Sequence, residues 1–366
     1  MDRNKFISQN DYLKENLQNK KSAYIYGYGT YAKVLSIFLR KKGITVNGYI
    51  LDKEYLNKVV KTKSDKLFHW EEILNKKENN YFICNGITSN PKKLNSKFYL
   101  LNKPRFVDVI DFLNIDQEFL TADWVNANKE EIKNLDKYLY DQRSKEVLNQ
   151  FVKNKLDYNL TNSTEFIDFG PLYFNKKIKP KNNEIYIDIG AYNGDTLLEY
   201  AEYNSKFSHI YLFEPNNSVY QKLKSNIAKI ANKKNITLYR YALSNQISKR
   251  YLSKENLTIM SKLTNNNLLA ENKELLITRK LDEFFLNKFY KESVRIKLDI
   301  NGYELKALEG GLNFIKEKKP IIITKLQTKE NLIKIPKLLK EVDSKYKIFL
   351  RQRGMGSLML MLYATV

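Results

Sequence analysis

Two acidic side chains stand at the ends of consecutive predicted strands, and glycines follow the first of them. In EIYIDIGAYNGDT (184–196), a buried strand leads into a turn at Asp188 and Gly190 and then into a helix that begins after Gly194. The strand HIYLFE ends at Glu214, where a carboxylate can accept both hydroxyl groups of a ribose. The spacing of the acidic residue and the glycines is typical of S-adenosylmethionine sites. Carboxylates also suit this cofactor, because it carries a sulfonium and an ammonium group. The alternative for Glu214 is a surface carboxylate at a strand end.

Asp299 is a third acidic residue at a predicted strand end. The run RIKLDINGYELKALEGG (295–311) predicts a strand that ends at Asp299, followed by a helix. The buried face of that helix is expected to carry Leu305, Leu308 and Leu312. Ligands of open α/β sheets bind at the carboxyl ends of the strands, so Asp299 is a candidate site residue. The alternative is a helix cap. Neither histidine can replace it, because His69 lies in another part of the chain and His209 begins a strand.

The elements that must position these side chains alternate between strand and helix, which predicts an α/β fold. Asn216 opens a helix after Glu214, and ITLYRYALS (236–244) predicts a third strand. The buried face of the helix is expected to carry Val219, Leu223, Ile227 and Ile230.

A separate strand, glycine turn and helix occur near the start of the chain, from Ala23 to Asp52. Gly27, Gly29 and Ala32 fit a dinucleotide fingerprint, with Asp52 where a ribose-binding carboxylate would stand. The helix is expected to bury Val34, Ile37 and Phe38 and to stop at Gly43. This turn has two alternative roles: it could bind NAD(P) or another nucleotide, or it could be purely architectural. We favour the architectural turn, because no hydride-transfer group can be placed opposite it. Strands at 81–85 and 106–113 could extend this sheet.

Between these two regions, residues 116–159 contain no proline or glycine, which favours a helical connector over a flexible linker. Its apolar positions at helical spacing are Ile132, Leu135, Leu139, Val147, Leu148 and Phe151. At about 150 residues per domain, the 366 residues predict two domains.

Composition excludes several classes of protein. The net charge of +22 comes from 63 Lys+Arg against 41 Asp+Glu, but most of it is dispersed lysine, which argues against a nucleic-acid groove. No run approaches the roughly 18 apolar residues of a spanning helix, and the start lacks a signal peptide, so we expect a cytoplasmic protein without integral membrane contact. With one cysteine and two histidines, zinc has almost no ligands, and we expect no metal.

Seven segments occur in order between Tyr173 and the C-terminus: YIDIGAYNGDT, FEPN, ALSN, RKLDEFF (279–285), IKLDINGYELKALEGG, KPIII (319–323) and YKIFLRQRGMGSLMLMLYA (346–364). With these segments, the region resembles the FkbM family of S-adenosylmethionine-dependent methyltransferases. The resemblance implies a class I methyltransferase fold, with a mostly parallel seven-stranded Rossmann-like sheet and an antiparallel last hairpin. It also implies O-methylation, often of a sugar in a bacterial surface glycan or of a secondary metabolite.

The resemblance also assigns residues. It implies that S-adenosylmethionine is bound by Asp188, Gly190, Asn193, Gly194, Asp195, Glu214, Asn216 and Ala242. The chain differs from the family at two places near the expected acceptor: Asn301 stands where an acidic residue is usual, and Leu326-Gln327 where a Tyr-His pair is frequent. Both differences remove a titratable group, which leaves Asp299 as the candidate catalytic residue to orient or deprotonate the acceptor hydroxyl.

The sequence therefore predicts a smaller Rossmann-like domain at 1–115, a helical connector at 116–165 and a methyltransferase domain at 166–366. The expected function is transfer of a methyl group from S-adenosylmethionine to a hydroxyl of a small molecule, sugar or glycan precursor. One alternative is a binding or scaffold protein of glycan biosynthesis whose methyltransferase fold has little turnover. A weaker alternative is an RNA methyltransferase, which the charge alone favours.

Overall fold

Two units make up the chain in the computed structural model, and each is described here by itself. One unit comprises Met1–Lys133, Glu146–Asp168 and Gly354–Met359, and the other comprises Asn134–Lys145, Phe169–Arg353 and Leu360–Val366. The residues that the structure describes are 22–41, 43–56, 65–76, 81–86, 106–107, 120–157, 165–168, 171–174, 178–204, 206–228, 235–253, 263–264, 273–288, 291–353 and 359–366.

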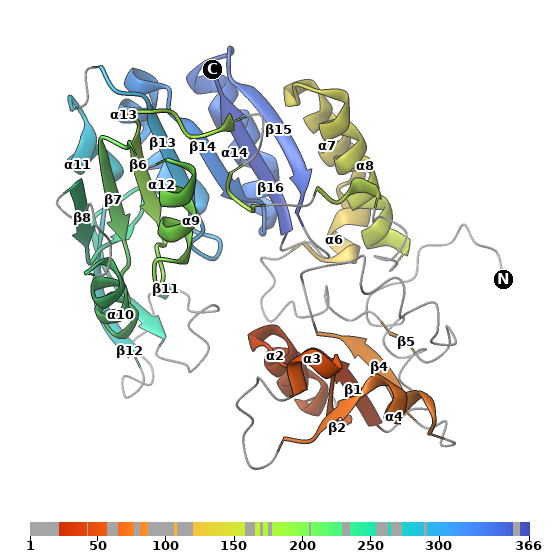
Figure 1. Cartoon of the computed structure of the whole chain (residues 1–366). Helices are drawn as coiled ribbons and strands as arrows, with labels where there is room; N and C mark the ends of the chain where they lie inside the picture. The colour runs from red at the N-terminus through yellow and green to blue at the C-terminus, as the bar shows by residue number, and fades with distance from the viewer. Residues whose placement is uncertain are drawn as a thin grey trace. The chain divides into compact units, whose positions relative to one another are not determined.

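The second unit contains a seven-stranded sheet in the order β15-β16-β14-β13-β6-β7-β8 (Figure 1). All neighbouring strands are parallel except β16, which runs antiparallel to both β14 and β15. This confirms the predicted class I methyltransferase sheet with its antiparallel last hairpin. The strands are β6 (Ile185–Ile189), β7 (His209–Phe213), β8 (Ile236–Tyr239), β13 (Val294–Leu298), β14 (Ile321–Lys325), β15 (Lys347–Gln352) and β16 (Leu360–Thr365).

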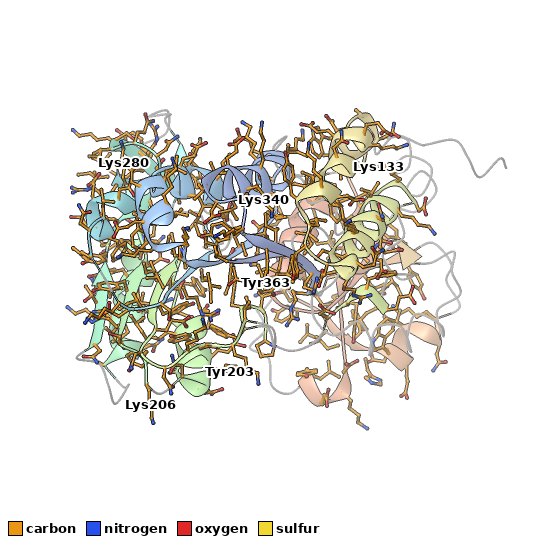
Figure 2. The ribbon with its side chains drawn as sticks, turned by 90° about the horizontal axis from the view of Figure 1, so that it is seen from above. Lys133, Tyr203, Lys206, Lys280, Lys340 and Tyr363 are labelled. Carbon is orange, nitrogen blue, oxygen red and sulfur yellow. The ribbon has the colours of Figure 1, made fainter. Side chains whose placement is uncertain are left out.

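Helices cover both faces of this sheet, so its central strands are buried on both sides. On one face, α9 (Asp195–Tyr203) and α10 (Asn217–Ile227) contribute to the main apolar core, where Tyr186 and Tyr200 stack with ring centroids 4.2 Å apart. Figure 2 shows Tyr363 of β16 inside this unit, whereas Lys206 and Lys280 project from its surface. The helices of the other layer are α11 (Leu281–Phe285), α12 (Glu304–Glu309), α13 (Leu312–Lys318) and α14 (Lys329–Val342).

The helix expected after Asp299 is two helices, α12 and α13, which Gly310 and Gly311 separate. Leu305 and Leu308 are buried as predicted, but Leu312 begins the second helix and is only partly buried. The backbone packs closely at this break: a Cβ at Gly310 would lie 2.1 Å from the backbone oxygen of Ser244, so only glycine fits.

The third strand is also shorter than expected. Its first part is β8, and after Arg240 and Tyr241 the chain enters a different, four-stranded sheet with the order β11-β10-β12-β9. The alternating pattern of ITLYRYALS continues across this break, so the pattern alone cannot show that the chain changes sheets. The strands of the smaller sheet are β9 (Ala242–Leu243), β10 (Ser248–Ser253), β11 (Leu263–Thr264) and β12 (Lys273–Arg279).

A buried ion pair joins the start of β6 to β13. Nε and Nη2 of Arg295 donate to the carboxylate of Glu184 at 2.9 and 3.2 Å, and neither side chain is exposed. Arg295 also donates to the backbone oxygen of Lys179 at 3.0 Å. Two strands of the sheet therefore depend on one fully desolvated pair.

We expect Arg295→Met to lower the free energy of unfolding by about 3–5 kcal/mol, because Glu184 would stay buried without its counter-ion. Urea denaturation followed by far-UV circular dichroism measures this change. The double variant Glu184→Gln/Arg295→Met should recover part of the loss. The matched control is Lys334→Met, whose exposed pair with Glu330 should contribute less than about 1 kcal/mol. Equal effects of Arg295→Met and Lys334→Met would contradict the prediction.

The first unit contains a parallel five-stranded sheet in the order β3-β2-β1-β4-β5, which confirms the predicted βαβ unit and its extension. Of the strand expected at 106–113, only Phe106–Val107 lies within the described residues. The elements are β1 (Ser22–Tyr26), α2 (Thr30–Lys41), β2 (Thr45–Leu51), α3 (Lys53–Leu56), β3 (Leu67–His69), α4 (Trp70–Leu74), β4 (Tyr81–Asn85) and β5 (Phe106–Val107).

The buried face of α2 differs from the expected one. Ala32, Leu35 and Leu39 are completely buried, whereas Ile37 is 47% exposed. The prediction for Ile37 was wrong because apolar residues occur on most of this helix, so spacing alone does not select the buried stripe. Gly43 follows the helix with a φ of 77°, as expected of a helix stop.

The predicted connector is mostly helical where it is described, and the six apolar residues named for it are all buried. Its residues divide between the two units, with changes after Lys133 and after Lys145. The two boundaries that the sequence predicts between the three segments stay predictions. The helices are α6 (Ala122–Ala127), α7 (Lys129–Lys133), the 3-10 helix η3 (Asn134–Tyr138) and α8 (Gln142–Asp157).

Candidate active site

Four strands of the large sheet end at one edge with polar groups. Gly190 follows β6, Glu214 follows β7, Asp299 follows β13, and Lys325 is the last residue of β14. Because these strands are parallel and adjacent, their carboxyl ends meet at the same edge. Open α/β sheets bind their ligands at this edge. The structure therefore brings the predicted site residues of all three acidic strand ends together.

The loop after β6 is compact and depends on glycine. Gly190, Tyr192 and Gly194 have φ values of 85°, 49° and 88°. A Cβ at Gly190 would lie 2.2 Å from the backbone oxygen of Asp299, so a side chain there would collide with the chain after β13. The absence of a side chain lets the backbone of this loop lie directly against the segment that carries Asp299.

Glu214 holds the loop to the next strand. Its two carboxylate oxygens accept hydrogen bonds from the backbone N–H groups of Tyr192 at 3.1 Å and Asn216 at 2.8 Å. Burial raises the pKa of Glu214 to about 7, although these two hydrogen bonds act in the opposite direction. Asn216 in turn caps α10 by accepting from the backbone of Val219 at 3.1 Å, as predicted.

Asp188 forms a buried ion pair with Lys297. Nζ of Lys297 lies 2.8 Å from Oδ1 of Asp188 and also donates to the backbone oxygen of Gly190 at 2.7 Å. Oδ2 of Asp188 accepts from the hydroxyl of Tyr186 at 3.3 Å. Burial alone would lower the pKa of Lys297, but Asp188 and Asp299 raise it above its usual value. Lys297 is therefore charged and supports the loop from within the sheet, and direct contact of Asp188 with a cofactor stays a prediction.

The remaining predicted cofactor residues lie around the same loop and its neighbours. Asn193 accepts from the backbone of Asp195 at 3.2 Å, and Asp195 is exposed at the start of α9. Ala242 is buried at the start of β9 in the smaller sheet. Their contact with a cofactor stays a prediction, as does that of Gly190 and Gly194.

Asp299 has two partners on one oxygen. Its Oδ2 accepts from the hydroxyl of Tyr173 at 2.6 Å and lies 2.5 Å from Nζ of Lys325. Burial would raise the pKa of Asp299, but Lys325 and Lys297 outweigh it and hold the pKa below its usual value. Asp299 is therefore an ionised carboxylate, and its side chain is 20% exposed.

The two places at which the chain differs from the family that it resembles are Asn301 and Leu326-Gln327, and of these Asn301 lies close to Asp299 in sequence. Asn301 has a φ of 54° in the turn after Asp299, and Gln327 is buried between β14 and α14. A buried carboxylate in the same region, Glu304, accepts from the backbone of Ile300 at 2.8 Å and from Asn331 at 2.6 Å. It therefore braces the turn from α12.

Tyr173, Lys297 and Lys325 were not predicted as site residues. A signal existed for the two lysines, because a charged residue in an otherwise apolar, buried strand needs a counter-ion. Tyr173 gives no such signal, since its contact with Asp299 spans 126 positions of the chain.

The described residues contain neither a candidate metal site nor a candidate membrane-spanning helix. Within the described residues, no group of three or more His, Cys, Asp or Glu side chains could hold a metal ion. The same part of the chain contains no helix that is long and apolar enough to cross a membrane.

The glycine turn after β1 belongs to the five-stranded sheet of the first unit. Gly27 has a φ of 105°, and Asp52 accepts from the hydroxyl of Tyr26 at 3.2 Å. The carboxylate expected at a ribose thus contacts a tyrosine of the neighbouring strand. That this turn is architectural stays a prediction.

Comparisons with known proteins agree with this geometry. Residues 188–346 match the family model described as the methyltransferase FkbM domain. A crystal structure of methyltransferase FkbM from Methylobacillus flagellatus has a TM-score of 0.68 and 17% identity, over 100% of this chain and 95% of that one. At that identity the likeness establishes the fold. No curated protein matches the chain.

Two further solved structures are similar over about half of the chain. A precorrin-6y C5,15-methyltransferase from Geobacter metallireducens has a TM-score of 0.31 and 13% identity, over 52% of this chain and 84% of that one. A methyltransferase of Streptococcus mutans in complex with SAH has a TM-score of 0.29 and 14% identity, over 51% and 90%.

Proposed function

We propose that this chain transfers a methyl group from S-adenosylmethionine to a hydroxyl group of a sugar or glycan precursor, on the basis that residues 188–346 match the family model described as the methyltransferase FkbM domain. The observation that supports this most strongly is the contact between the Gly190 loop and the segment of Asp299. A residue suited to a hydroxyl acceptor therefore adjoins the loop suited to the cofactor.

The residues at the loop fit the cofactor. Its glycines leave room for a ligand close to the backbone, and Glu214 is a buried carboxylate at the strand end where a ribose is expected. Asp195, exposed at the start of α9, adds negative charge near a ligand that carries a sulfonium and an ammonium. When bound, S-adenosylmethionine supplies a methyl group that is activated for displacement.

Asp299 has the properties of an orienting group. Its low pKa keeps it ionised, so it can accept a hydrogen bond from the acceptor hydroxyl and hold the oxygen at near-attack distance. The same low pKa makes it a weak base, which favours orientation over retention of the proton. In the transfer, the acceptor oxygen would form the new bond to carbon, the electron pair of the broken carbon–sulfur bond would stay on sulfur, and the hydroxyl proton would be released to water.

Cofactor affinity should depend on pH through Glu214. Ribose hydroxyls donate hydrogen bonds, so they favour the ionised carboxylate, which is the minor form below its pKa of about 7. The dissociation constant should therefore rise by about tenfold when the pH falls from 8 to 6. Titration calorimetry with S-adenosylmethionine measures it. The Glu214→Gln variant should lose this dependence, and a wild-type slope in that variant would assign the titration to another group.

The proposed function is tested by release of S-adenosylhomocysteine from the full chain with S-adenosylmethionine. The acceptors are a panel of nucleotide-sugars and simple glycosides, with an RNA sample and a reaction without acceptor as comparisons. We expect transfer to at least one sugar acceptor. Methylation of RNA alone would replace the sugar proposal, and cofactor binding without transfer to any acceptor would favour the scaffold alternative.

A further inference from the structure

The three residues Tyr173, Asp299 and Lys325 form a cluster, here called the Asp299 cluster, that comes from three separated parts of the chain. Tyr173 precedes the matched domain, Asp299 follows β13, and Lys325 ends β14. Both donors of the cluster meet the same carboxylate oxygen, Oδ2. Within the part of the chain that the structure describes, Oδ1 accepts no hydrogen bond.

This asymmetry separates the two oxygens by role. Oδ2 is anchored by a tyrosine hydroxyl and an ammonium, which fixes the plane and the charge of the carboxylate. Oδ1 can still accept a hydrogen bond, and the side chain of Asp299 is 20% exposed. An acceptor hydroxyl needs one such oxygen in a fixed position.

We propose that Lys325 is a positioning residue, which anchors Oδ2 of Asp299 so that Oδ1 holds the acceptor hydroxyl, with Tyr173 as the second anchor. The inference rests on the proposed function and extends it to two residues that the family resemblance did not assign. Lys325 acts through Asp299 and not on the methyl group.

The surroundings of Asp299 show why an anchor is needed. The charged and titratable groups that face it are Lys325 from β14, Lys297 from β13, Tyr173 from the segment 171–174, and Glu304 from α12. Nζ of Lys297 binds Asp188 and Gly190, so Lys325 is the lysine in direct contact with Asp299. Without Lys325, burial would favour the protonated form of Asp299, which accepts a hydrogen bond from a hydroxyl less strongly than the carboxylate does.

The segment that carries Tyr173 is held in place by hydrogen bonds from two residues near the C-terminus. The hydroxyl of Tyr363 donates to the backbone oxygen of Leu172 at 2.6 Å, and Arg353 donates to that of Pro171. The ring of Tyr173 also lies 5.1 Å from Nζ of Lys297. Burial and Asp299 raise the pKa of Tyr173 well above its usual value, so its hydroxyl remains a donor.

The test compares Lys325→Met, Lys325→Arg and Tyr173→Phe in the full chain, with Lys334→Met as the matched control. Lys334 also pairs with a carboxylate, Glu330, but on the exposed face of α14. The first readout is the pKa of Asp299 from the carboxyl signals of ¹³C-aspartate-labelled protein, assigned with Asp299→Asn. It needs no acceptor.

We expect Lys325→Met to raise the pKa of Asp299 by at least one unit, which is about a tenfold change in its acid dissociation constant. Tyr173→Phe should raise this pKa less. Lys325→Arg and Lys334→Met should leave it near the wild-type value. An unchanged pKa in Lys325→Met would overturn the proposal, whether or not an acceptor is known.

The second readout is the pH profile of kcat with the sugar acceptor that gives turnover. Asp299 must be ionised, so a raised pKa should make Lys325→Met lose activity as the pH falls and regain it at high pH. Lys325→Arg should restore the profile. A loss of activity that is equal at every pH would indicate a merely structural role and would overturn the proposal. If no sugar in the panel is methylated, the proposed function fails while the pKa readout still decides on Lys325.

Discussion

Asp299→Asn is expected to lower kcat by about 10²-fold while the affinity for S-adenosylmethionine changes only a few fold. The amide keeps the shape of the side chain but loses the negative charge. That charge pairs with Lys325 and strengthens the hydrogen bond from the hydroxyl of the methyl acceptor. Groups that act on the reacting proton contribute about 10² to 10⁴ in rate, and the low pKa of Asp299 places it toward the lower end.

Steady-state kinetics with the acceptor found in the panel, together with calorimetry for the cofactor, separate the two effects. The matched control is Glu330→Gln, an exposed carboxylate that also pairs with a lysine, and it should keep wild-type rates. Near wild-type kcat in Asp299→Asn would reduce Asp299 to a structural residue. Loss of cofactor binding without a separate kinetic effect would assign it to the cofactor instead.

Glu214→Ala is expected to weaken S-adenosylmethionine at least about tenfold. Each hydrogen bond from a ribose hydroxyl to the carboxylate contributes on the order of 1.5 to 3 kcal/mol. The structure adds a second cause, because alanine would also release the backbone N–H groups of Tyr192 and Asn216 that position the loop.

Calorimetry with S-adenosylmethionine and S-adenosylhomocysteine, below the melting temperature of the variant, measures the affinity. Glu214→Gln is the informative comparison, since its amide oxygen can still accept one of the two backbone hydrogen bonds. It should therefore bind more tightly than the alanine variant and less tightly than the wild type. Wild-type affinity in Glu214→Ala would remove Glu214 from the cofactor site.

The sequence predicted the strand ends well because local patterns specify them. Glu214 follows a mostly apolar run and Asp299 follows a run in which apolar residues alternate with Arg295 and Lys297, and parallel strands bring such ends to one edge. The cap at Asn216 is equally local, since its partner is three residues away.

What the sequence could not predict depends on distant contacts. Tyr173 reaches Asp299 only in the folded chain, and the need for glycine at position 310 comes from the distant backbone of Ser244. Ile37 was misplaced for a different reason: the helix has apolar residues on several sides, and the sheet determines which of them is covered.

The order of the strands also determines how this unit could be excised. A fragment cut at the limits of the family match, residues 188 and 346, would lose both β15 and β16 as well as Tyr173. Because β16 pairs with β14, its removal would turn a buried central strand into an open edge, which invites aggregation. The smallest soluble fragment should therefore begin at or before Asn134, because residues 134–145 belong to the same unit, and extend through Thr365 at the end of β16.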